Sequence, residues 1–116
     1  MARIAIVIRL AEVRKLAQDC GYRAREIAKR MGLSLSQLER RFHDEHKIGP
    51  QRYLNALEMQ DAALKLEKER LVKAVAFEMG YTRSSFTRAF KRHCGVSPAA
   101  YIARTIQRQS QQTRAR

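Results

Sequence analysis

Apolar residues recur at helical spacing along most of the chain, and this pattern predicts an all-α fold. Near the N-terminus, one apolar face predicts a first helix from about Ile6 to Cys20, with Gly21 as its stop. The apolar positions of this helix are Leu10, Val13, Leu16, Ala17 and Cys20. The β-branched stretch from Ile4 to Ile8 is also compatible with extended backbone, so the start of the helix stays open.

The next segment predicts a helix-turn-helix over residues 24–47. A short helix ends at Gly32, and the Ser34 hydroxyl can cap the helix that follows. Ala28 is small enough to let two helices cross closely, and Leu38 fills the angle between them. The apolar positions of the two helices are Ile27, Ala28 and Met31, then Leu35, Leu38 and Phe42. Many helical hairpins share this pattern, so one copy does not specify the motif by itself.

A long helix is predicted over residues 50–68, because a proline fits the first helical position, where its missing N–H is not needed. Its apolar positions are Tyr53, Leu54, Leu57, Ala63, Leu64 and Leu66. A second helix-turn-helix follows over residues 72–94, with Gly80 at the turn and either Thr82 or Ser84 as the cap. Its apolar positions are Val72, Val75, Ala76, Met79, Phe86, Ala89 and Phe90.

Beyond the second unit, Gly95 ends a helix and the Ser97-Pro98 pair begins another. This last helix is predicted over residues 97–106, so the folded domain is expected to span residues 1–102 and the turn of helix beyond them. Residues 107–116 contain Arg and Gln but no acidic residue, and they are expected to form a flexible basic tail.

Shifting the chain by 48 positions aligns the two helix-turn-helix units, which indicates an internal duplication. The identical pairs are Ala28/Ala76, Met31/Met79, Gly32/Gly80, Ser36/Ser84, Arg40/Arg88, Phe42/Phe90, Pro50/Pro98 and Tyr53/Tyr101. These eight identities exceed the roughly two that average composition gives over about thirty positions. A helical solenoid is the alternative, but it needs three or more repeats to bury its faces.

The composition points to a polyanionic partner. The chain has 116 residues, a formal charge of +13 and a pI near 10.7, and 45% of its residues are apolar. Nucleic acid is the leading partner, because Arg and Lys are spread through the whole chain, and an anionic membrane surface is the weaker one. The apolar run from Ile4 to Ile8 is far shorter than the roughly 20 residues that span a membrane. A cytoplasmic, nucleoid-associated protein without membrane contact is therefore expected.

Neither metal binding nor catalysis is indicated by the residue patterns. Cys20 and Cys94 are isolated thiols without metal-ligand spacing. The simplest interpretation is that both act as small buried apolar residues in a reducing compartment. No paired spacing links His43, His46 and His93 into a zinc site, and surface or groove-facing histidines are the simpler interpretation. Because no nucleophile-base pattern, phosphate loop or carboxylate pair is present, we expect no enzyme, no cofactor and no metal.

The second unit resembles the DNA-binding domain of the AraC/XylS family of bacterial transcription regulators. The residues that carry the resemblance are Ala76, Met79-Gly80-Tyr81, Phe86-Thr87-Arg88-Ala89-Phe90-Lys91-Arg92, Gly95-Val96-Ser97-Pro98 and Tyr101. The likeness extends from Leu10 to about Ile102. It implies a seven-helix domain with two helix-turn-helix subdomains joined by the long helix, as in the short stand-alone members or an excised domain. Family members usually carry one residue more between the second turn glycine and Phe86.

Burial of the apolar stripes turns one polar stripe of each second helix outward. These stripes are Ser36, Glu39, Arg40 and His43 in the first unit, and Ser84, Thr87, Arg88 and Lys91 in the second. The predicted base-facing residues are Ser36, Glu39, Arg40, Ser84, Thr87 and Arg88, and the resemblance implies that these positions face bases or backbone. An arginine in the major groove pairs bidentately with guanine or binds a phosphate. Glu39 can accept from cytosine, or it can pair with His43 or an arginine.

Phosphate contacts are expected around these helices. The predicted backbone-binding residues are Ser34, Gln37, Arg41, His43, Lys47, Arg52, Arg83, Ser85, Lys91 and Arg92. The helix N-termini at Ser34, Gly49 and Ser97 add oriented N–H groups. For Arg41 and Arg92, an ordinary charge on the helix surface is an equal alternative.

These patterns predict sequence-specific binding of double-stranded DNA by two recognition helices in adjacent major grooves, about 34 Å apart. A helix of residues 50–68 suits that spacing, so a monomer is expected on DNA. The main alternative is a nucleoid-type protein that binds nucleic acid without sequence preference. A helical adaptor that binds a protein such as RNA polymerase is a second alternative, and RNA polymerase stays open as a further partner. Activation and repression are both compatible with the sequence.

Overall fold

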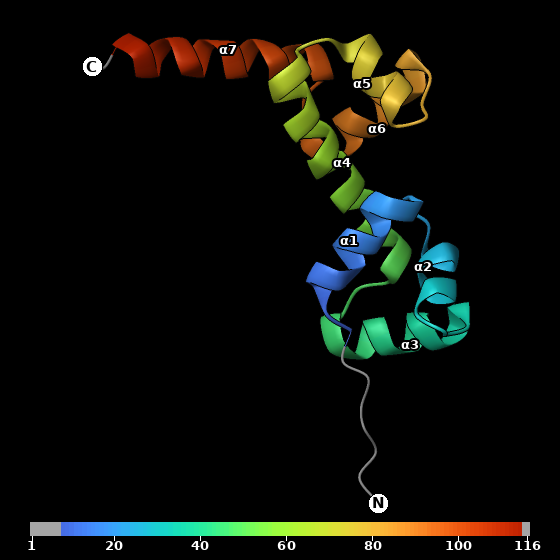
Figure 1. Ribbon diagram of the computed structural model, residues 1–116. Helices are drawn as coiled ribbons and strands as arrows, with labels where there is room; N and C mark the ends of the chain where they lie inside the picture. Colours follow the sequence, from blue (N-terminus) through green and yellow to red (C-terminus); the bar gives the residue numbers. More distant parts are fainter. Residues whose placement is uncertain (1–7, 115–116) are drawn as a thin grey trace, which may run out of the picture. The chain divides into compact units, whose positions relative to one another are not determined.

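The computed structural model describes residues 8–114, apart from the side chains of residues 112–114 (Figure 1). Within this range the chain forms seven α-helices and no strand, which confirms the predicted all-α fold. The helices are α1 (Leu10–Cys20), α2 (Ala24–Arg30), α3 (Leu35–His46), α4 (Pro50–Glu69), α5 (Val72–Glu78), α6 (Arg83–Cys94) and α7 (Pro98–Arg114).

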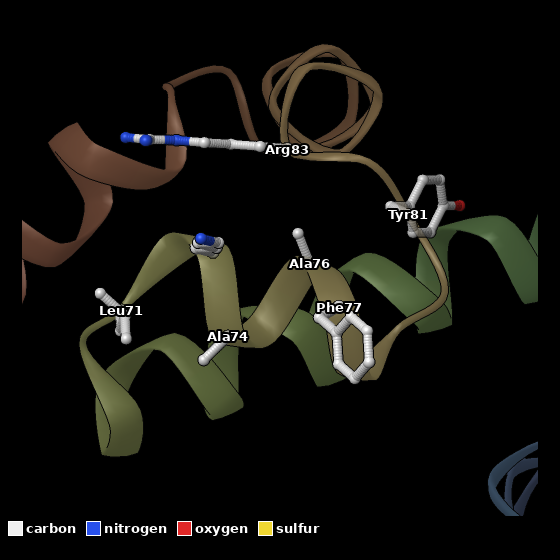
Figure 2. A pocket seen from close by; sticks show the side chains of 7 residues that line it. Leu71, Ala74, Ala76, Phe77, Tyr81 and Arg83 are labelled. Atoms are coloured by element: carbon white, nitrogen blue, oxygen red, sulfur yellow. The ribbon is translucent and has the colours of Figure 1, made fainter.

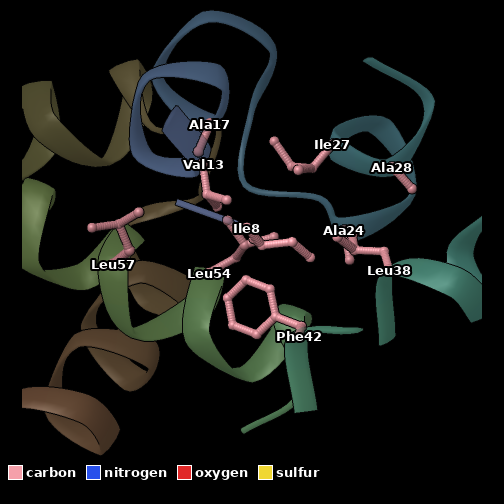
Figure 3. Packing of buried hydrophobic residues seen from close by; sticks show 10 residues of the cluster. All are labelled: Ile8, Val13, Ala17, Ala24, Ile27, Ala28, Leu38, Phe42, Leu54 and Leu57. Atoms are coloured by element: carbon pink, nitrogen blue, oxygen red, sulfur yellow. The ribbon is translucent and has the colours of Figure 1, made fainter. Parts of the chain in front are cut away.

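The helices build two compact units, each with its own hydrophobic core. The first unit extends to Glu58, so α4 contributes its first half to this unit and its second half to the other. In the first unit Phe42, Leu38 and Ile27 are fully buried, and Figure 3 shows them converging with side chains of α1 and α4. The core of the second unit comprises Met59, Ala62, Leu66, Val75, Ala76, Phe86 and Phe90. Each core fixes the orientation of one helix-turn-helix.

The duplication is present in the structure down to single hydrogen bonds. Adding 48 to the bounds of α2 and α3 yields the bounds of α5 and α6, and the same shift relates the starts of α4 and α7. In the turns, the N–H of Leu33 donates to the Ala28 carbonyl at 2.8 Å, and that of Tyr81 to the Ala76 carbonyl at 2.9 Å. The turn glycines Gly32 and Gly80 have φ angles of 73° and 80°, a left-handed conformation that favours glycine at both positions.

The first helix begins later than the apolar pattern predicts. It begins at Leu10 and not at Ile6, which lies outside the described residues together with Val7. The backbone of Ile8 forms hydrogen bonds with side chains of α3. Its N–H donates to the Glu45 Oε2 and its carbonyl accepts from the His46 Nε2, both at 2.8 Å. The Ile8 side chain is buried in the first core. Hydrogen bonds to α3 therefore replace the first helical turn.

The last helix is longer than predicted. It continues through residues 107–114, where a flexible tail was expected; residues 115–116 of that predicted tail lie outside the described range. No Gly or Pro interrupts this segment, and Gln and Arg have high helix propensity. The Arg70 guanidinium also donates a hydrogen bond to the Gln109 Oε1. Two residues predicted on apolar faces, Leu10 and Leu64, are exposed.

Candidate nucleic-acid interface

A reciprocal cap begins α3 and sets the position of its polar stripe. The Ser34 Oγ accepts a hydrogen bond from the Gln37 N–H at 3.1 Å, and the Gln37 Oε1 accepts one from the Ser34 N–H at 2.9 Å. Because Leu38 and Phe42 are fully buried, the rotation of the helix about its axis is fixed. The opposite side is exposed and carries Ser36, Glu39, Arg40 and His43.

The α6 helix repeats this arrangement with one difference at its cap. The Thr82 Oγ1 accepts a hydrogen bond from the Ser85 N–H at 3.2 Å, so Thr82 and not Ser84 is the cap. Phe86 and Phe90 are fully buried. Ser84, Arg88 and Lys91 are consequently exposed along one line of the helix, at the spacing of Ser36, Arg40 and His43 in α3. Because α6 begins three residues after Gly80, as α3 does after Gly32, Arg83 to Ser85 occupy its first turn.

This doubled arrangement also matches a known family. Residues 27–104, which include both turns and both polar stripes, match the family described as Helix-turn-helix domain. The chain belongs to the AraC-type helix-turn-helix family.

Two regulators share sequence with this AraC-type chain. The raffinose operon transcriptional regulatory protein RafR of Pediococcus pentosaceus is 36% identical over 73 residues, which are 61% of this chain and 26% of that protein. The HTH-type transcriptional regulator MtrA of Neisseria gonorrhoeae is 37% identical over 71 residues, which are 60% of this chain and 24% of that protein. The chain therefore spans about a quarter of the length of these curated relatives.

A solved structure supports the fold. The crystal structure of a DNA-binding transcriptional dual regulator from Escherichia coli K-12 matches with a TM-score of 0.71 at 24% identity. The match covers 82% of this chain and 89% of that chain. At this identity the likeness establishes a shared fold.

The residues predicted to contact the DNA backbone differ in their solvent exposure in this AraC-type fold. Exposed residues of this set are Ser34, Gln37, His43, Lys47, Arg52, Arg83, Lys91 and Arg92. Arg41 and Ser85 are half-buried, and the Arg41 Nη1 is buried without a hydrogen-bond partner. Arg41 is thus the least accessible cation of the predicted set.

Some polar groups of the interface are already engaged within the protein. The Thr87 Oγ1 donates to the Arg83 carbonyl at 2.9 Å, so this hydroxyl keeps only its acceptor capacity for a base or a phosphate. The Lys47 Nζ donates to the Asp44 carbonyl at 3.1 Å and has two further protons to donate. Glu39 makes no ion pair with His43 or with an arginine in the described part of the chain. Its carboxylate remains available to a ligand.

Two arginines that the sequence patterns did not single out lie beside α3. Arg23 and Arg25 line a surface hollow of about 540 Å³ together with Glu39 and Arg52. Gln51 positions them, because its Oε1 accepts from the Ala24 N–H at 2.8 Å and its Nε2 donates to the Tyr22 carbonyl at 2.9 Å. These bonds join the start of α2 to the start of α4. The residues involved are 27 and 29 positions apart, so periodicity within one helix could not reveal the cluster.

The cysteines and His46 pack against the cores. Cys20 and Cys94 are half-buried, and burial raises the pKa of the Cys94 thiol. His46 packs edge-on against the Phe42 ring, with 4.9 Å between ring centroids. Within residues 8–111, no three His, Cys, Asp or Glu side chains are grouped to hold a metal ion. None of the described helices is long and apolar enough to cross a membrane.

Proposed function

We propose that this chain binds double-stranded DNA sequence-specifically as the DNA-binding part of a bacterial transcription regulator. One observation carries the proposal: the same serine and arginine recur on the exposed sides of α3 and α6, opposite a buried core in each unit. A protein that binds nucleic acid through charge alone needs no such repetition of a matched polar stripe. The role is binding and regulation, without a catalytic step.

In this proposal α3 and α6 are the recognition helices. Arg40 and Arg88 each donate two hydrogen bonds to a guanine edge, and Ser36 and Ser84 lie one turn earlier on the same stripe. The Glu39 carboxylate accepts from a cytosine amino group, and Thr87 contributes its acceptor lone pairs. The exposed cations around the helices, with Arg23 and Arg25 added, bind phosphates and hold the protein in register.

We expect one chain to occupy two adjacent major grooves. The 20 residues of α4 extend about 30 Å at the usual rise of a helix, close to the roughly 34 Å between grooves on one face of B-DNA. The binding site is then asymmetric, because the two recognition helices differ at Glu39 and Thr87. This role belongs to the cytoplasm, where a bacterial regulator meets the nucleoid.

Selection of bound duplexes from a random pool tests the proposal. The expected result is an asymmetric motif with two conserved blocks about one helical turn apart, bound more tightly than random competitor DNA. Failure to enrich any motif, with equal affinity for all duplexes, would favour the nucleoid-type alternative.

A further inference from the structure

Beside the exposed Lys73 and Glu78, the outward side of α5 carries a strip of apolar residues, where a surface helix normally exposes polar side chains. Phe77 is 84% exposed and Leu71 is 58% exposed. Figure 2 shows Leu71 just before α5, Ala74 and Phe77 along the helix, and Tyr81 beyond it. These residues line a hollow of about 580 Å³, called the α5 hollow, together with Lys73 and Arg83.

The duplication provides an internal comparison, and it indicates that the fold does not require this apolar strip. At a shift of 48 positions, Leu71 corresponds to Arg23, which precedes α2, and Ala74 and Phe77 correspond to Glu26 and Lys29 of α2. The buried sides of the two helices match, since Ala28 and Ala76 are both buried at the crossing. Because the first unit folds with charges at these positions, the apolar strip beside α5 is not required for folding, and exposed apolar patches of this kind are typical of interaction sites.

The chemistry around the hollow selects the kind of partner. Lys73 and Arg83 are exposed, and neither forms an ion pair in the described part of the chain. A complementary ligand therefore carries carboxylates next to a large apolar group. A second copy of this chain is opposed by its net charge of +13. The concave shape and the volume suit an inserted side chain better than a flat lipid surface.

We infer that the α5 hollow docks a short acidic segment of a partner protein. One large apolar side chain of that segment inserts between Leu71, Phe77 and Tyr81, and neighbouring carboxylates contact Lys73 and Arg83. The surface lies on the first helix of the second helix-turn-helix. It shares Arg83, the first residue of α6, with the predicted backbone contacts, but it does not include the stripe of Ser84, Arg88 and Lys91.

The test uses the full chain and a fluorescent eight-residue peptide that contains six Asp or Glu residues, one Phe and one Leu. Anisotropy measures its affinity, and amide shifts in two-dimensional NMR locate the contact. We expect shifts over residues 71–83 and at least a tenfold loss of affinity in Phe77→Lys, which introduces the residue that α2 carries at this position. Lys73→Gln should weaken binding several-fold.

Leu64→Lys is the matched control, because Leu64 is also an exposed apolar residue and the added charge is the same. It should leave the affinity unchanged. If Phe77→Lys alters the helical spectrum or the melting temperature, Phe77→Ser replaces it. Equal binding of a peptide with Ser in place of Phe and Leu, or shifts centred on Ser84, Arg88 and Lys91, would overturn the inference. Binding of phosphatidylglycerol vesicles that depends on Phe77, without peptide binding, would also overturn it in favour of a membrane.

Discussion

At the scale of single residues, Arg40 and Arg88 are equivalent in position and in exposure. Each lies one turn beyond an exposed serine, on the side of its helix opposite a buried phenylalanine. The turns before the two helices have the same length and the same left-handed glycine. The two arginines are therefore expected to make the same kind of contact in the two halves of a DNA site.

Replacing either arginine tests this equivalence. Arg40→Ala and Arg88→Ala should each weaken binding to a selected site by about 1–3 kcal/mol and relax base preference in one half of it. The fold should persist, because both side chains are exposed. Footprints and anisotropy titrations on single-base variants of the site provide the measurement. Lys91→Ala is the control, and it should weaken all sequences alike. If the two arginine variants also lose affinity equally for all sequences, the arginines contact phosphates and not bases.

Lys47 ends α3 in a conformation that suits glycine better. Its φ is 60°, and the equivalent residue at the end of α6 is Gly95, with φ 81°. We predict that Lys47→Gly raises the free energy of unfolding by about 0.5–1 kcal/mol, since glycine adopts this backbone without steric cost. Urea denaturation measures the change. Lys47→Ala removes the same charge and the same bond to Asp44 but keeps the Cβ, so it should not stabilise. Equal effects of the two substitutions would contradict the explanation.

At the scale of elements, two hydroxyl residues at the start of α6 have different roles. Thr82 caps the helix, whereas Ser84 is exposed and makes no cap bond. Thr82→Ala should lower the free energy of unfolding by about 1 kcal/mol. Ser84→Ala should change the free energy of unfolding by no more than about 0.5 kcal/mol and weaken specific DNA binding instead. Thermal melts and anisotropy on the same two variants test both expectations. Stability loss in Ser84→Ala alone would reverse the assignment.

A second element-scale feature is the carboxyl pair near the ends of α4 and α5. A hydrogen bond between the two side chains raises the pKa of Glu69 and lowers the pKa of Glu78, which the Lys65 Nζ also contacts at 3.3 Å. The Glu69 contribution to stability is full below its unfolded pKa and is lost as pH rises through its folded pKa. The Glu78 contribution is present above its unfolded pKa and is lost as pH falls through its folded pKa. The two trends oppose each other.

Replacing Glu78 tests whether its hydrogen bond is the cause of the raised pKa of Glu69. In Glu78→Gln, the pKa of Glu69 should fall toward its ordinary value, because the carboxylate that shares its proton is absent. Carbon-detected NMR titration of the side-chain carboxyl groups measures this shift. In the comparison variant Lys65→Met, the pKa of Glu78 should rise while that of Glu69 changes less. An unchanged Glu69 pKa in Glu78→Gln would show that the hydrogen bond does not persist in solution.

At the scale of the whole molecule, charge dominates the expected behaviour. A chain with +13 net charge and basic residues in both units should bind duplex DNA with a steep dependence on salt. We expect affinity to fall by about a thousandfold or more between roughly 50 and 200 mM salt, as for proteins with six to ten phosphate contacts. Anisotropy titrations across that range measure the slope. Sedimentation on a minimal selected site should yield one chain per duplex, and an obligatory complex of two chains would refute the expectation of a monomer.

The sequence by itself determined the features that depend on neighbours along the chain. Turn glycines, caps and helical periodicity specified both helix-turn-helix units, because each acts within a few residues. The shift of 48 positions then identified the equivalent residues on α3 and α6 from the order of amino acids alone. Burial of one apolar stripe leaves only one side of a helix for solvent, so the exposed stripe containing Arg40 and Arg88 was also predictable.

Only the tertiary structure decided the features that depend on partners far away in sequence. Ile8 looked like the first turn of a helix, but Glu45 and His46 hold its backbone from α3. The cluster around Arg23 depends on bonds that Gln51 makes across 27 or 29 positions. Periodicity identifies the apolar face of each helix, but it does not show which other elements pack against that face. It could therefore not show that Phe77 remains exposed. Burial is a property of the packed chain, because it depends on which distant side chains arrive at each surface.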